Sequence, residues 1–158
     1  MTPISVCIVC RNEADKLGPC LESVAWSDDV VVMDLRSADG SGALAESHGA
    51  RVVEHEPVPI VERVRNEVAQ QAAHDWILVL DPDERIAPGL PAMLRDVATR
   101  EDIHAVVIPR MNYDFGYPPS SPLQRYEPQL RMYRRAQVAW PEIPNALPDV
   151  PEAHLARI

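Results

Sequence analysis

A regular alternation of short apolar runs with amphipathic stretches is the feature that most restricts the fold. β-prone runs occupy residues 4–10, 30–33, 51–54 and 76–80, and the segments between them show the apolar spacing of helices. Strands that alternate with helices at this spacing form βαβ units with right-handed crossovers. The sequence therefore predicts an α/β domain with a mostly parallel sheet and helices on both faces.

The first two helices also show turn and cap signals. The first carries an apolar stripe at Leu17, Cys20, Leu21 and Val24, and Asn12 is its expected N-cap. Asp39 precedes a Gly-Ser pair and is the expected cap of a short helix around residues 43–48, which Gly49 should end.

The second half of the chain is less regular. Further helices are predicted at 60–72 and after Pro91, and a strand at 105–108. Residues 112–128 should form a long loop, and residues 130–133 should return as a strand. The tail after Trp140 contains four prolines, which exclude a regular helix there.

Composition limits the class of protein. The chain has 158 residues, 46% of them hydrophobic and 25% charged, as expected of one globular domain. Its formal net charge is −9 and no long basic run is present, so we expect no nucleic-acid partner. The odd count of three cysteines, with no secretion signal and no stretch long enough to span a bilayer, predicts a cytoplasmic protein with buried, reduced thiols.

The apolar run 76–80 ends at three carboxylates, Asp81, Asp83 and Glu84. Carboxylates so close together repel one another, and a divalent cation or several hydrogen bonds would keep them ionised. Mg²⁺ or Mn²⁺ suits such oxygen ligands and commonly completes its shell with substrate phosphates. Ligands of open α/β sheets bind beyond the carboxyl ends of the strands, where this cluster should lie. The alternative is an acidic turn that caps the next helix.

The order of motifs resembles the family 2 glycosyltransferases of the GT-A fold, and among them the small bacterial enzymes that build the lipopolysaccharide core. The matching stretches are Ile8 to Glu13, Cys20 to Val24, Val32 to Asp34 with Ser37 to Gly40, Arg65 with Asn66, and Leu80 to Arg85. The resemblance implies a Rossmann-like GT-A sheet, a nucleotide-sugar donor, Mn²⁺ or Mg²⁺, and transfer with inversion to a glycan, lipid-linked or small-molecule acceptor.

The resemblance assigns residues to the nucleotide sugar. Val9, Arg11 and Glu13 match the nucleoside-binding end of the first strand, Asp34 the carboxylate that reads the base, and Arg65 the basic residue near the diphosphate. Each assignment has a structural alternative. Asp34 would otherwise be a strand-end acid, and Arg65 a solvated helix residue.

Asp81 and Asp83 match the two acids of the family's DxD signature. The resemblance places Asp81 near the ribose or sugar and Asp83 on the metal. Metal held by Asp83 would neutralise charge on the departing nucleoside diphosphate.

The sequence departs from the family in two places. Leu35 and Arg36 stand where relatives read Ser-Gly, and the His-Glu pair expected after Trp140 is absent. Glu142 is the nearest carboxylate and our candidate for the general base of transfer.

We expect a single domain over 1–158, with 1–110 as the nucleotide-sugar-binding half and 111–158 as a truncated acceptor-side half. A catalytically reduced accessory or nucleotide-sugar-binding protein is the alternative function, with a partner chain or a homo-oligomer completing the acceptor site. The inner face of the membrane is an alternative location. A nucleotidyltransferase or a Rossmann oxidoreductase is disfavoured, because no glycine-rich loop follows the first strand.

Overall fold

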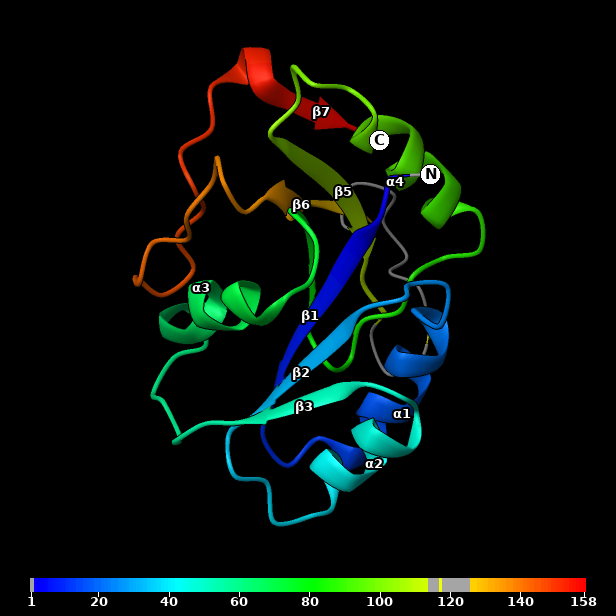
Figure 1. The fold of residues 1–158 in the computed structure, drawn as a ribbon, viewed down its shortest axis with the longest axis vertical. Helices are drawn as coiled ribbons and strands as arrows, with labels where there is room; N and C mark the ends of the chain where they lie inside the picture. Colours follow the sequence, from blue (N-terminus) through cyan, green and yellow to red (C-terminus); the bar gives the residue numbers. More distant parts are fainter. Residues whose placement is uncertain (1, 114–116, 118–125) are drawn as a thin grey trace.

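The computed structural model describes residues 2–113, 117 and 126–158. Strands and helices alternate through the first hundred residues, and strands dominate the rest (Figure 1). In chain order the elements are β1 (Ile4–Cys10), α1 (Ala14–Ser23), β2 (Val30–Asp34), α2 (Ser41–Ser47), β3 (Arg51–Glu54), α3 (Glu62–Gln71), β4 (Trp76–Leu80), α4 (Leu90–Ala98), β5 (Ala105–Met111), β6 (Tyr126–Arg134), the 3₁₀ helix η1 (Glu152–His154) and β7 (Leu155–Arg157).

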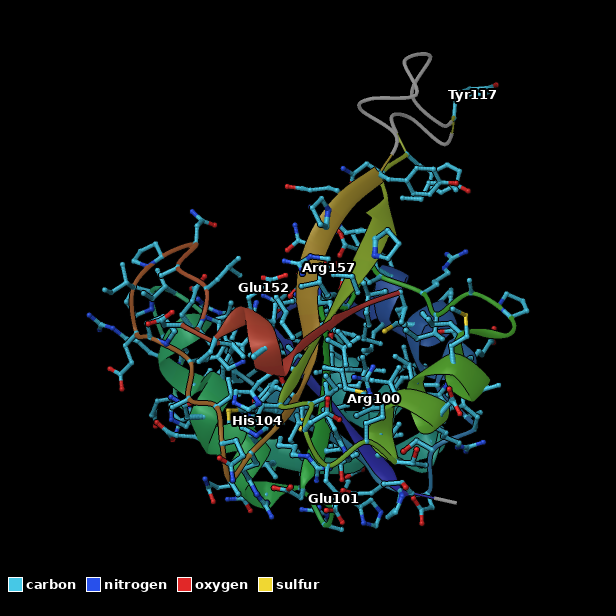
Figure 2. The ribbon with its side chains drawn as sticks, turned by 90° about the horizontal axis from the view of Figure 1, so that it is seen from above. Arg100, Glu101, His104, Tyr117, Glu152 and Arg157 are labelled. Atoms are coloured by element: carbon cyan, nitrogen blue, oxygen red, sulfur yellow. The ribbon has the colours of Figure 1, made fainter. Side chains whose placement is uncertain are left out.

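The described strands form one mixed sheet in the order β3-β2-β1-β4-β6-β5-β7. β3, β2, β1 and β4 are parallel, β6 is antiparallel to both β4 and β5, and β7 is parallel to β5. Beyond the body of the domain, β5 and β6 continue side by side (Figure 2). The predicted mostly parallel α/β sheet is confirmed.

Helices cover both faces of the sheet, as predicted. α1, α2 and α4 pack on one face with Ile4, Val6 and Ile8 of β1. α3 packs on the other face, together with the segment that carries Val138 and Trp140 (Figure 1). Side chains alternate between the faces along a strand, so a strand buried on both sides needs the unbroken apolar runs seen in the sequence.

The predicted N-cap of α1 was wrong. Asn12 does not cap α1: it has a left-handed φ of 54° and its Oδ1 accepts a hydrogen bond from the Ala38 N–H at 2.7 Å. The carboxylate of Asp39 instead accepts the first N–H of both helices, from Ala14 of α1 at 2.9 Å and from Ser41 of α2 at 3.0 Å. The loop before α2 lies against the start of α1 and provides the nearer acceptor.

The predicted loop at 112–128 was too long, because β6 already begins at Tyr126; residues 114–116 and 118–125 of that loop lie outside the described residues. β6 covers the predicted strand 130–133. β7 was not predicted. It has three residues and pairs with β5, and Ile158 after it donates to the Val107 carbonyl at 3.3 Å.

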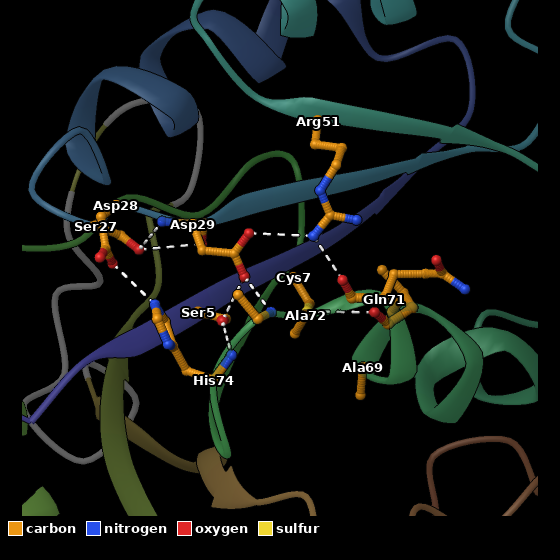
Figure 3. A network of polar contacts seen from close by, with 12 residues as sticks. Ser5, Cys7, Ser27, Asp28, Asp29, Arg51, Ala69, Gln71, Ala72 and His74 are labelled. Atoms are coloured by element: carbon orange, nitrogen blue, oxygen red, sulfur yellow. Dashed lines mark hydrogen bonds and ion pairs between the residues drawn. The ribbon is translucent and has the colours of Figure 1, made fainter.

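The amino ends of the strands are joined by a hydrogen-bond network around Asp29 (Figure 3). Its carboxylate accepts from the Ser5 hydroxyl at 2.5 Å, the Ala73 N–H at 2.7 Å and the Arg51 guanidinium at 3.2 Å. The network links β1, β2, β3 and the turn before β4. It lies at the sheet edge opposite the carboxyl ends.

The cysteines are buried and free, as predicted. Burial raises the pKa of Cys7, Cys10 and Cys20 to about 12, so the thiols stay protonated and unreactive at neutral pH. Within the described part of the chain, no helix is both long and apolar enough to cross a membrane.

Candidate functional site

A pocket of about 360 Å³ lies at the carboxyl ends of β1 and β4. The parallel register aligns these ends, since Ile8 pairs with both Leu80 and Val32, and the residues that follow meet at one edge. The pocket is lined by five residues that the sequence singled out, namely Val9, Arg11, Glu13, Asp81 and Asp83. We call it the first pocket.

Asp83 lies on the wall of the first pocket with an exposed side chain. No ion pair or hydrogen bond of its carboxylate is found with the residues that the structure describes. Leu35 and Val61 add apolar wall. Of the two residues that replace Ser-Gly in this chain, Leu35 therefore lines the pocket, whereas Arg36 pairs with the exposed Glu56.

Asp81 is held by two arginines. Its Oδ2 accepts from Nη2 of Arg131 at 2.7 Å, and its Oδ1 lies 3.5 Å from Nη2 of Arg65. Both arginine side chains are almost fully buried, at 9% exposure or less, whereas that of Asp81 is 37% exposed. Burial lowers the pKa of Arg65, and the negative charge of Asp81 opposes that effect.

Glu84 closes the turn after β4. Its Oε2 accepts the Asp81 N–H at 3.1 Å, and its Oε1 accepts from Arg131 and from Arg110, the latter at 3.3 Å. Burial alone would lower the pKa of Arg110, but Glu127 and Glu84 raise it. The turn is therefore tied to β5 and β6 by charge-assisted hydrogen bonds.

A second pocket of about 380 Å³ shares Asp81 with the first. Its walls come from α3, β5, β6 and residues 140–147, and Arg65, Arg110 and Arg131 all line it. Arg65 also lies over the ring of Trp140, 4.6 Å from its centroid. We call this the second pocket.

Asn66 fixes the wall that Trp140 provides. Its side-chain amide donates to the Trp140 carbonyl at 2.9 Å, and its Oδ1 accepts the Trp140 N–H at 2.9 Å. In the Arg-Asn motif, Arg65 therefore lines the second pocket, and Asn66 holds the segment at Trp140 by two hydrogen bonds.

Two candidates from the sequence line neither pocket. Asp34 is 7% exposed, and its Oδ1 accepts the Ser37 N–H at 2.9 Å, so its carboxylate is engaged in the loop before α2. Glu142 is exposed and lines neither pocket among the described residues.

Sequence reasoning missed the arginine network. Arg131 lies in the predicted strand 130–133 but had no assigned role, and Arg110 gave no local signal. Arg110 and Arg131 meet Glu84 only in the fold, at sequence separations of 26 and 47 residues. Asn66 was recognised only as part of a motif.

Comparison with known proteins identifies the family. The sequence profile described as "Glycosyl transferase family 2" matches residues 5–149. The chain belongs to glycosyl transferase family 2. The resemblance read from the motif order is thereby confirmed.

Two curated relatives of this family 2 chain align over most of its length. A TPR repeat-containing protein of Synechococcus elongatus is 32% identical over 138 residues, which cover 85% of this chain and 34% of that protein. The lipopolysaccharide core biosynthesis glycosyltransferase LpsC of Rhizobium meliloti is 29% identical over 141 residues, or 85% of this chain and 52% of LpsC. The chain thus spans between a third and about half of these relatives.

Solved structures support the GT-A fold of the family 2 chain. TarS 1-349 of S. aureus superposes with a TM-score of 0.67 at 21% identity, over 85% of this chain and 48% of that one. The same TarS fragment has been solved in complex with UDP and with UDP-GlcNAc. At this identity the similarity establishes the fold alone.

Proposed function

We propose that this domain transfers a sugar from a nucleoside-diphosphate sugar to an acceptor hydroxyl, with inversion and with help from a divalent metal ion. The observation that carries the proposal is the first pocket, where Asp83 lies exposed beside Asp81 at the carboxyl edge of the sheet. The family match and the UDP and UDP-GlcNAc complexes of TarS support a nucleotide-sugar donor.

The side chains present suit a hard divalent ion that is partly coordinated by substrate. Among the described residues no three His, Cys, Asp or Glu side chains form a complete metal site. Mg²⁺ and Mn²⁺ often take one or two carboxylates and complete their shell with phosphate oxygens. We propose Asp83 as the ligand of Mn²⁺ or Mg²⁺, because Asp81 already pairs with Arg131 and Arg65. When bound, the ion would neutralise charge on the leaving diphosphate.

The other residues of the first pocket would bind the nucleoside end of the donor. Val9, Arg11 and Glu13 form one wall, and Asp34 lies directly before the lining residue Leu35. Asp34 accepts the Ser37 N–H in the loop before α2, and this loop would border the base. Asp81 lines both pockets and would contact the donor sugar. Arg65 lies beside Asp81 on the wall of the second pocket and would contact the diphosphate where the two pockets meet.

In this proposal, the two halves of the domain have separate tasks. Residues 1–110 provide most of the first pocket, and residues 111–158 provide much of the second, which would receive the acceptor. Glu142 is the proposed base that removes the acceptor proton. As it lies outside both pockets here, it would have to approach the acceptor when the acceptor binds. The relation to LpsC supports a role in cell-envelope glycan synthesis, which we propose takes place in the cytoplasm or at the inner face of the membrane.

An accessory protein that binds a nucleotide sugar without turnover is the second candidate function. The exposed position of Glu142 outside both pockets favours it, as does the lack of a His-Glu pair after Trp140. A partner chain or a second copy would then supply the missing base.

A thermal-shift experiment tests the donor site. UDP, UDP-GlcNAc, UDP-glucose and GDP-mannose are each added with and without Mn²⁺. A ligand at about 100 times its Kd stabilises the folded state by about 2.7 kcal/mol, which corresponds to a Tm rise of about 5 to 10 °C. We expect such a rise with Mn²⁺ for at least one donor, its loss in Asp83→Ala, and its retention in Asp96→Ala, which removes an exposed acid of α4 outside the first pocket.

No shift with any nucleotide, or an undiminished shift in Asp83→Ala, would contradict the proposal. A donor-hydrolysis assay on the same samples separates the two candidate functions. An enzyme should release UDP slowly even without acceptor, and an accessory protein should release none.

A further inference from the structure

The second pocket has the chemistry of a carbohydrate site, an inference that rests on the proposed transferase function. It adjoins the first pocket at Asp81, and its volume of about 380 Å³ lies in the range of small-molecule sites, about 300 to 1,000 Å³. The residues proposed to bind the donor include none from β5, and neither Gln129 nor residues 145–147. An acceptor here would lie next to the donor sugar.

The charges of the pocket balance. Among the described lining residues, Arg65, Arg110 and Arg131 face the acids Glu62, Asp81 and Glu127. Arg131 donates to Asp81 at 2.7 Å, and Arg110 donates to Glu127 at 2.6 Å. A phosphorylated or acidic ligand would therefore meet carboxylates beside each guanidinium, and like charges at close range disfavour binding.

A neutral sugar suits this lining better. Each hydroxyl both donates and accepts a hydrogen bond, and the pocket offers acceptors in its carboxylates and donors in its guanidinium groups and in the amides of Gln129 and Asn145. Apolar surface is also present, since Leu147 lines the pocket with 57% of its surface exposed and Pro128 lies nearby. The C–H face of a pyranose would pack there.

We infer that the second pocket binds the acceptor as a neutral sugar, with its hydroxyls on the alternating carboxylate, guanidinium and amide groups and its apolar face on Leu147. The pocket accordingly selects against sugars that carry a phosphate or a carboxylate.

Saturation-transfer NMR in the presence of UDP and Mg²⁺, which unlike Mn²⁺ does not broaden the signals of nearby protons, tests this selection. The probes are the methyl glycosides of glucose, galactose, mannose and N-acetylglucosamine, each compared with its 6-phosphate, and the hexosides also with their uronic acids. We expect at least one neutral glycoside to bind, with its charged counterparts at least about tenfold weaker. Absence of binding by every neutral glycoside, or tighter binding of a charged one, overturns the inference.

Matched variants locate the binding. Leu147→Ala should weaken binding of the neutral glycoside about fivefold or more. Ile143→Ala should leave the binding unchanged, because Ile143 is similarly exposed in the same segment but does not line the pocket. Glu127→Gln should reduce the preference for neutral over phosphorylated sugar at least about threefold, since it leaves an excess of positive charge. Glu101→Gln, an exposed acid outside the pocket, should not change it.

The donor thermal shift, measured on the same samples, separates the two proposals. If none of the nucleotides gives a shift with Mn²⁺, the proposed function fails. If the shift is present but sugar binding does not respond to Leu147→Ala or Glu127→Gln, only the assignment of the second pocket fails.

Discussion

Nη2 of Arg131 lies 2.7 Å from Oδ2 of Asp81 and also donates to Glu84, so one buried guanidinium joins β6 to the turn that follows β4. The sequence places these partners 50 and 47 residues apart. Because Asp81 lines both pockets and Arg131 lines the second, the contact connects the first pocket to the second.

Replacing Arg131 by Met should destabilise the protein. The change leaves Glu84, which is 12% exposed, with Arg110 as its remaining charged partner among the described residues, and loss of one partner from a buried pair costs about 3 to 5 kcal/mol. We expect the free energy of unfolding to fall by about 3 kcal/mol in urea titrations.

The pair Arg131→Met and Glu84→Gln forms a double-mutant cycle. If the guanidinium and carboxylate interact as the structure shows, the double variant should lose at least about 1 kcal/mol less than the sum of the single losses. Additivity within about 0.5 kcal/mol would contradict the contact.

Asn66→Ala should loosen the segment that begins at Trp140. The substitution leaves the N–H and C=O of Trp140 without their side-chain partners, and each unsatisfied buried group costs about 1 to 3 kcal/mol. Gln70→Ala is the control, because it replaces an exposed amide on the same helix. We expect Asn66→Ala alone to lower the unfolding free energy by about 2 kcal/mol and to speed proteolysis within residues 140–150. Equal stability of the two variants would show that the hydrogen bonds between Asn66 and Trp140 do not stabilise the protein.

Glu142→Gln tests the proposed base. If Glu142 removes the acceptor proton, the variant should lose about a hundredfold or more in transfer rate while its donor-induced thermal shift is unchanged. The side chain is exposed, so the substitution should leave stability unaffected. Full transfer activity in this variant would assign the base to another residue.

The fold was predictable because its signals are local. An apolar run followed by a polar turn and an apolar stripe identifies a strand and a helix without reference to the rest of the chain. This pattern predicted β1 to β4 and the presence of helices on both faces of the sheet. β7 gave no such signal. It is three residues long after a proline-rich tail, and its pairing with β5 decides its conformation.

The candidate site was predictable only in part, for the same physical reason. Val9 lies at the carboxyl end of β1, and Arg11, Glu13, Asp81 and Asp83 follow the ends of β1 and β4. Parallel strands bring these carboxyl ends together. The partners of Asp81 depend on tertiary packing, as does the use of Asp39 rather than Asn12 at the start of α1. Spacing along the chain contains no information on such contacts.

Asp29 gives the stability of the domain a dependence on acid pH. Burial alone would raise the pKa of its carboxyl, but hydrogen bonds from Ser5, the Ala73 N–H and Arg51 outweigh burial and lower it (Figure 3). A lowered pKa in the folded state means that the unfolded chain binds the proton more tightly, so the stabilisation is complete above the unfolded pKa of about 3.9 and is lost as the pH falls through the folded value.

Asp29→Ala should therefore cost about 2 kcal/mol in unfolding free energy at pH 7, since hydrogen bonds to a charged group are worth about 1.5 to 3 kcal/mol. The difference from wild type should shrink as the pH is lowered from about 5 to 3 in urea titrations. Asp28→Ala is the matched control, because the Asp28 carboxylate is next in sequence but is 75% exposed and contacts only His74 among the described side chains. A pH-independent cost at position 29, or an equal effect at position 28, would mean that the carboxylate charge does not hold the amino ends of the strands together.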